Sequence, residues 1–162
     1  TFPKPVIAAV NGHAVAGGAG LASVCDFVVM SEEANLGYSE VKLGFVAALV
    51  SVFLIRQVGE RRSRDLLLSA RLIEAKEGLE FGLVNEIQAS NKVMTRALEL
   101  AQQLLQNAPN ALATTKRLLA DLPSLSLQES LRHAAKVNAE IRGGEELREG
   151  IRAFLEKRQA QW

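Results

Sequence analysis

The stretch "PVIAAVNGHAVAGGAGLASVCDFVVM", residues 5–30, decides the fold class of this chain. It begins with one apolar run, Pro5–Val10, and ends with a second, Phe27–Met30. Apolar runs with β-branched residues are typical of strands that are buried on both faces of a parallel sheet. Between them, "GLASVCD" has the length of a short helix. We therefore expect an α/β arrangement in which two strands are joined by a turn and a helix.

The cluster "AGGAG", Ala16–Gly20, needs a reason because glycine weakens both helices and strands. A phosphate-binding loop fits it poorly, since the G-x-x-x-x-G-K-[ST] spacing is absent and G-x-G-x-x-G is matched badly. A plain turn explains one or two of the glycines but not all of them. Free N–H groups at a helix start, which can bind developing negative charge, explain the cluster best. Gly17 and Gly18 are then the donors, and Gly20 lies on the same helix face as Gly17.

A carboxylate follows in "LGYSEVKLG", residues 36–44. Ser39 is expected to cap a helix, which places Glu40 in its first turn. Glu40 in this position either favours the helix dipole or takes part in catalysis. The second interpretation gains weight because Glu40 opens an apolar helix. A partly desolvated carboxylate close to an oxyanion site is a good proton shuttle.

The remainder of the chain is expected to be mainly helical. Gly44 and Gly59 are expected to divide the apolar segment that follows Glu40 and to end it. We expect a helix over Ile73–Gly82 and a last strand within "LVNEIQ". Ser90 can cap a further helix. From Pro109 to the end of the chain, only helices are expected.

So few strands do not make a stable sheet without partners. The strand at Pro5–Val10 would leave an exposed edge, which is an aggregation risk unless another segment or chain covers it. We therefore predict oligomerisation or an N-terminal partner segment. The chain also begins at Thr1 without a Met, which suggests processing or a piece of a longer chain.

Composition excludes several classes of protein. The 162 residues are 48% hydrophobic and 23% charged, with a net charge of +1, and no basic stripe indicates nucleic-acid binding. No run is long enough to span a membrane, and no signal peptide is present. Cys25 cannot form an internal disulfide, which fits the cytoplasm. His13 and His133 are too far apart for a metal-ligand motif, so no metal is expected.

These segments together resemble the enoyl-CoA hydratase/isomerase (crotonase) family. The shared features are the strand "KPVIAAVNG", a small-residue turn into a helix, the dipeptide "CD", a further strand, and the G-x-x-E turn Gly37–Glu40. The later segments "ARLIEAKEGLEFGLVNEI" and "GIRAFLEKRQAQW" also resemble the family. The resemblance covers nearly the whole chain and corresponds to the C-terminal two-thirds of a member. The part of the family pattern that this chain matches does not include the loop that supplies the first oxyanion donor.

The resemblance implies an α/β fold: a crotonase-like spiral of ββα units, partial here, followed by a C-terminal helical trimerisation region. Residues 1–89 would be the ββα core with the active-site motifs, and residues 90–162 the helical region for oligomerisation. Members bind an acyl-CoA thioester, so coenzyme A belongs to the substrate and no separate cofactor is expected. They assemble as trimers or as dimers of trimers. Phe154 and Lys157 match positions that in some members touch CoA bound to the neighbouring subunit.

The resemblance also implies roles for individual residues. Gly17 matches the second oxyanion donor, and Gly18, Gly20 and Gly37 belong to the motifs that bind the substrate. Glu40 matches the second of two glutamates that position water and move protons in typical hydratases. The first of these glutamates falls on Gly20, which has no side chain to do this work.

Three functions follow from these matches. The first is hydration of a 2-enoyl-CoA through an oxyanion-stabilised enolate, with Glu40 as acid and base. The second is 3,2-trans-enoyl-CoA isomerisation by the single Glu40, because one carboxylate can move a proton from C2 to C4. The third is a truncated, non-catalytic assembly subunit. The loop after Gly44 reads "VAALVS" instead of the family's "PG-x-GG", which favours an apolar, branched or bulky acyl group.

Overall fold

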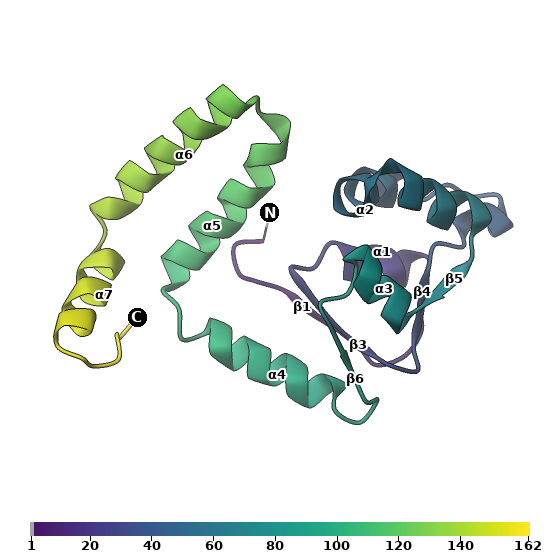
Figure 1. Cartoon of the computed structure of the whole chain (residues 1–162), viewed down its shortest axis with the longest axis horizontal. Coiled ribbons are helices and arrows are strands. Elements are labelled where there is room, and N and C mark those ends of the chain that lie inside the picture. Colours follow the sequence, from purple (N-terminus) through teal and green to yellow (C-terminus); the bar gives the residue numbers. More distant parts are fainter. Residues whose placement is uncertain (1) are drawn as a thin grey trace. The chain divides into compact units, whose positions relative to one another are not determined.

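The structure is a computed structural model that describes residues 2–162. The chain divides into two compact units. The first unit is Val6–Ala101 and holds all the strands of the described chain, as Figure 1 shows. The second unit is Gln102–Trp162 together with the segment that ends at Pro5, and its regular elements are helical. The division expected at residues 89 and 90 stays a prediction.

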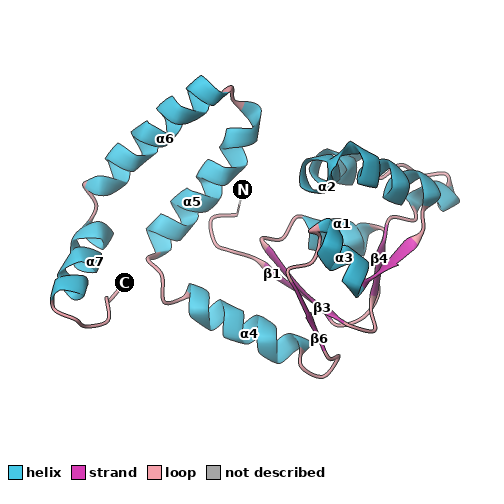
Figure 2. Ribbon diagram, in the orientation of Figure 1, coloured by secondary structure: helices cyan, strands magenta, loops and turns pink. Residues whose placement is uncertain are grey.

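The first sheet of the Val6–Ala101 unit is parallel throughout. Its strands are β1 (Ile7–Val10), β3 (Phe27–Ser31) and β6 (Glu86–Gln88), in the order β1-β3-β6 (Figure 2). β1 and β6 fall within segments that were predicted as strands, and β3 extends the predicted strand Phe27–Met30 by one residue. β1 pairs only with β3, so it is an edge strand in the described part of the chain, as expected.

The second sheet contains two strands, β2 and β5, that the sequence analysis missed. β4 (Asn35–Gly37) pairs in parallel with β2 (Ala14–Val15) and antiparallel with β5 (Leu72–Glu74). The helix expected from Ile73 is therefore wrong at its start: α3 spans Ala75–Phe81. Ile73 is buried and pairs with β4, so a tertiary contact overrides the local helical pattern there.

The strands and helices repeat in ββα units. The first unit runs β1, β2 and α1 (Gly17–Ser23), and the second runs β3, β4 and the 3-10 helix η1 (Glu40–Leu43). In each unit the first strand joins one sheet and the second strand joins the other. Because β2 and β4 are adjacent and parallel, α1 and η1 begin at the same edge of the second sheet.

A long helical segment, α2 (Ala48–Ser69), packs against α1 and η1. The expected break at Gly59 is confirmed, because its φ of 77° lies in the left-handed region and interrupts the helix. Gly44 also ends η1 as expected, with a φ of 71°. The hydrophobic core packs α2 and α1 against both sheets, and it includes Met30, Leu36, Leu54, Leu66 and Ile73.

Helix α4 (Val93–Leu104) packs against the first sheet. Val93 and Ala97 of this helix are buried together with Val29 of β3. Ser90 was expected to cap this helix, but its hydroxyl donates to the Glu33 carboxylate over 2.6 Å. Ser90 therefore connects the segment that precedes α4 to the turn after β3.

The helical unit contains α5 (Pro109–Asp121), α6 (Leu127–Arg142) and α7 (Glu145–Leu155), with a 3-10 turn, η2 (Leu122–Ser124), between α5 and α6. Pro109 opens α5 as predicted. Helices α5 and α6 contact each other as an antiparallel pair (Figure 1). Among residues 2–162, no helix is long and apolar enough to cross a membrane.

Candidate active site

The two segments that carry the predicted site residues are held together by the second sheet. Val15 at the end of β2 pairs with Gly37 at the end of β4. One residue further on, the Ala16 amide donates to the Gly37 carbonyl over 2.8 Å. Gly17 follows directly, and Glu40 is three residues beyond Gly37. The Gly17 amide and the Glu40 carboxylate therefore follow the carboxyl ends of neighbouring parallel strands, which is where α/β sheets usually bind ligands.

The helix start at Gly17 has an unusual backbone. Ala16 has φ 52° and ψ −121°, a conformation that side-chain-bearing residues seldom adopt. The Gly20 amide closes the first turn by donating to the Ala16 carbonyl over 2.9 Å. The amides of Gly17 and Gly18 precede it, so they have no acceptor within the helix. Both glycines are exposed, and a Cβ added at either would meet no atom within 4 Å.

Glu40 is only 8% exposed, although it is a carboxylate at the start of a four-residue 3-10 helix. Its Oε2 atom is buried and makes no hydrogen bond with any residue in the described range 2–162. Ser39 occupies the expected cap position, but its side chain makes no capping hydrogen bond. An unpaired buried carboxylate oxygen is costly, and such groups concentrate where a protein binds or transforms a ligand.

Tyr38 is a buried neighbour of Glu40 that the sequence analysis did not identify. It is 1% exposed, and its hydroxyl shares a 2.5 Å hydrogen bond with the Ser23 hydroxyl. Ser23 uses its own proton to donate to the Ala19 carbonyl over 2.8 Å, so Tyr38 is the donor to Ser23. The bond joins α1 to the segment that carries Glu40.

The environment keeps Tyr38 protonated. Burial raises the pKa of the Tyr38 hydroxyl, the Ser23 hydrogen bond lowers it, and the negative charge of Glu40 raises it. The net pKa lies above the ordinary value. Gln57 of α2 also donates to the Ser23 carbonyl, which ties a third element to this network. The only sequence signal for this hydrogen-bond network is Tyr38 itself, a tyrosine two residues before Glu40.

Gly37 has a packing role that the sequence analysis did not reveal. A Cβ at this position would lie 2.6 Å from Leu72 Cδ2 and 2.9 Å from the Arg71 carbonyl oxygen. Gly37 therefore allows β5 to approach β4 closely. Its predicted role in substrate binding stays a prediction.

Substitution of Gly37 by alanine is expected to destabilise the protein by about 1–3 kcal/mol, because the backbone of β5 must shift to make room. The matched control is Gly12→Ala, since a Cβ at Gly12 would meet nothing within 4 Å. The control should change stability by no more than about 0.5 kcal/mol. Denaturant unfolding measures both variants, and equal effects would show that the close approach at Gly37 is unimportant.

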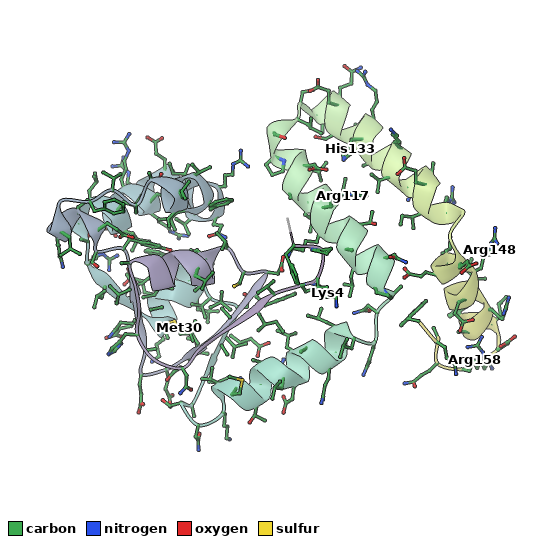
Figure 3. All side chains as sticks on the ribbon, turned by 180° about the vertical axis from the view of Figure 1, so that it is seen from behind. Lys4, Met30, Arg117, His133, Arg148 and Arg158 are labelled. Atoms are coloured by element: carbon green, nitrogen blue, oxygen red, sulfur yellow. The ribbon has the colours of Figure 1, made fainter. Side chains whose placement is uncertain are left out.

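Phe154 and Lys157 lie in the helical unit, at the end of α7. Phe154 is 82% exposed, and Lys157 is exposed with a φ of 53°. The following chain is anchored by Arg158, which Figure 3 labels beyond α7 and which binds Glu149 through two contacts of 2.6 and 3.0 Å. Arg158 and the Gln161 amide lower the pKa of Glu149 to about 2. Phe154 thus lies in the last turn of α7 and Lys157 in the turn that follows this helix, and their role in CoA binding stays a prediction.

Comparison with known proteins gives the family. The family model for enoyl-CoA hydratase/isomerase matches residues 1–162. The chain belongs to the enoyl-CoA hydratase/isomerase family, as the motifs predicted. The "Putative enoyl-CoA hydratase" of Thermus thermophilus is 58% identical over 158 residues, which cover 98% of this chain and 62% of the relative. The "2,3-dehydroadipyl-CoA hydratase" of Escherichia coli is 37% identical and is covered to 62%.

Solved structures confirm the fold. The crystal structure of an enoyl-CoA hydratase from Bacillus anthracis matches with a TM-score of 0.95 at 31% identity. An enoyl-CoA hydratase from Mycobacterium tuberculosis matches with a TM-score of 0.94 at 30% identity. The matches cover 100% and 99% of this chain, but 63% and 64% of those chains. The chain therefore has the crotonase fold of ββα units with C-terminal helices, and it spans about three-fifths of the length of these relatives.

Proposed function

We propose that this chain supplies one oxyanion donor and the acid/base residue of an enzyme that hydrates 2-enoyl-CoA thioesters. The observation that carries the proposal is the buried, unpaired carboxylate of Glu40 at the same sheet edge as the exposed Gly17 amide. The names of the two curated relatives support the same substrate class.

In the proposed reaction the thioester oxygen accepts a hydrogen bond from the Gly17 amide. This donor stabilises the negative charge that develops on the oxygen as the enolate forms. Water adds its oxygen to C3 and C2 gains a proton, so one water is consumed and a 3-hydroxyacyl thioester forms. Glu40 accepts the proton from water and returns a proton to C2. Gly18 and Gly37 border the donor site, and Phe154 and Lys157 would contact coenzyme A that is bound to the neighbouring subunit.

Isomerisation of a 3-enoyl-CoA is the second candidate. The observation in its favour is Gly20, which has no side chain, so the site has one candidate carboxylate, Glu40, where typical hydratases have two. In isomerisation one carboxylate removes a proton from C2 and returns it to C4, and no water is consumed. The Gly17 donor would stabilise the same enolate in both reactions.

Incubation of the natural protein with 2-enoyl-CoA and with 3-enoyl-CoA separates the two candidates. Hydration predicts that oxygen from labelled water enters the product at C3. Isomerisation predicts that the 3-enoyl thioester becomes the conjugated 2-enoyl thioester without oxygen uptake. Turnover of neither substrate would contradict the proposed function.

The proposed assembly is a homotrimer or a dimer of trimers, in the cytoplasm. Helices of the helical unit expose large apolar side chains, which are common where another surface covers them. These side chains are Leu119, Leu127, Leu131, Phe154 and Leu155. Mass measurement of the protein with and without acyl-CoA tests this proposal. A stable oligomer without affinity for CoA would instead favour the non-catalytic assembly subunit.

A further inference from the structure

Helices α1 and α2 meet at Gly20 and Val50. A Cβ added at Gly20 would lie 2.5 Å from the Cγ2 methyl of Val50 and 3.8 Å from its Cβ. The first distance is far below van der Waals contact, whereas the second is an ordinary contact. Gly20 is buried, and Val50 packs against the core beside it. The γ-methyl of Val50 therefore occupies the space that a side chain at position 20 would need.

This contact joins the two segments of the candidate site. Gly20 lies one turn after Gly17 on the same face of α1. Val50 lies in the first turn of α2, which follows η1 and contacts it. The connecting chain is held to the site by the Phe45 amide, which donates to the Glu40 carbonyl over 3.0 Å. Substitution of Val50 therefore changes the packing between the segment that carries Gly17 and the segment that carries Glu40.

We propose that Val50 is a specificity-determining residue that keeps this site to a single carboxylate, Glu40. A β-branched side chain in a helix is largely confined to one rotamer, so the methyl group does not swing away to admit a larger residue at position 20. The inference rests on the proposed function, because it assigns Val50 its effect on the same reaction.

The chemical consequence concerns water addition. With one carboxylate, Glu40 must take the proton from water and also deliver the proton to C2. A second carboxylate at position 20 would divide this work: one group takes the proton of the attacking water, and the other protonates C2. The same atoms are exchanged in both cases, and only the number of proton carriers differs. Removing the γ-methyl groups should therefore allow a glutamate at position 20 to assist hydration.

The steric part of the proposal is tested by melting of the natural protein and its variants. Gly20→Ala alone should lower Tm by roughly 2–10 °C, because the new Cβ overlaps with the Val50 methyl. Adding Val50→Ala, which leaves only the contact at 3.8 Å, should restore most of this loss. The matched control is Val52→Ala, since Val52 is exposed on the same helix and should restore nothing. A Gly20→Ala variant with unchanged Tm would overturn the proposal.

The chemical part is tested with Gly20→Glu, Val50→Ala and the double variant. The double variant should hydrate 2-enoyl-CoA at least about tenfold faster than either single variant, a modest share of what a positioned acid or base supplies. A double variant no faster than the single variants would overturn the inference while leaving the proposed function intact. If the unsubstituted protein turns over neither the 2-enoyl nor the 3-enoyl thioester, the proposed function fails, and this inference fails with it.

Discussion

Replacement of Glu40 by glutamine should reduce kcat by about 10²–10⁴-fold on whichever enoyl-CoA the natural protein accepts. The amide has the same shape as the carboxylate but cannot carry the proton. Stability should not fall, because Oε2 of Glu40 makes no hydrogen bond with the described residues and the substitution removes a charge from a buried place. Steady-state turnover measures the first effect and thermal melting the second.

The control for this variant is Glu32→Gln, since Glu32 is an exposed carboxylate in the turn between β3 and β4 of the same ββα unit. It should leave kcat unchanged. Tyr38 gives an independent readout, because the charge of Glu40 raises its pKa. In the Glu40→Gln variant the Tyr38 titration should therefore move to lower pH. A loss in kcat of less than about tenfold on both substrates would show that Glu40 is not the acid/base residue.

The sequence predicted what depends on local backbone preferences. Gly44 and Gly59 break the helical segments because both adopt a positive φ that glycine tolerates best. Strands β1 and β3 were recognisable because their apolar runs are continuous, although only Val10 of β1 is buried. The start of α1 at Gly17 agrees with the interpretation of the glycine cluster as a helix N-terminus.

The second sheet could not be predicted in this way. β2 has two residues and β5 has three, which is too short for a periodic pattern to appear. Each is stabilised as a strand by pairing with β4, a contact between distant segments. The helix expected from Ile73 failed for this reason. The ββα repeat is likewise visible in the arrangement of strands and not in any repeated sequence.

The candidate site shows the same division. Glu40 and Gly17 could be selected because each stands at a recognisable helix start. The bond between Tyr38 and Ser23 and the contact between Gly20 and Val50 join residues that are far apart in the chain. Neither spacing nor composition predicts such pairs. The close approach of β5 to Gly37 is also a long-range contact, and it gives this glycine a reason that is independent of any ligand.

Removal of the Gly17 amide hydrogen should reduce kcat by about 10²–10³-fold, the usual effect of losing one oxyanion donor. Gly17→Pro removes this hydrogen at the first residue of α1, where proline is best tolerated in a helix. Because the donor acts on charge that develops during the reaction, the loss should appear in kcat more than in KM. Kinetics on the preferred enoyl-CoA measure both constants.

Gly17→Ala is the matched control, since it keeps the amide hydrogen and its Cβ would meet no protein atom within 4 Å. It should retain a much larger share of kcat than Gly17→Pro. Proline also restricts Ala16, whose ψ of −121° lies outside the range preferred before proline, so Tm is measured for both variants. If Gly17→Pro lowers Tm, an ester bond in place of the Ala16–Gly17 amide removes the same hydrogen without introducing the proline ring. A folded ester variant with normal kcat would exclude the Gly17 amide as an oxyanion donor.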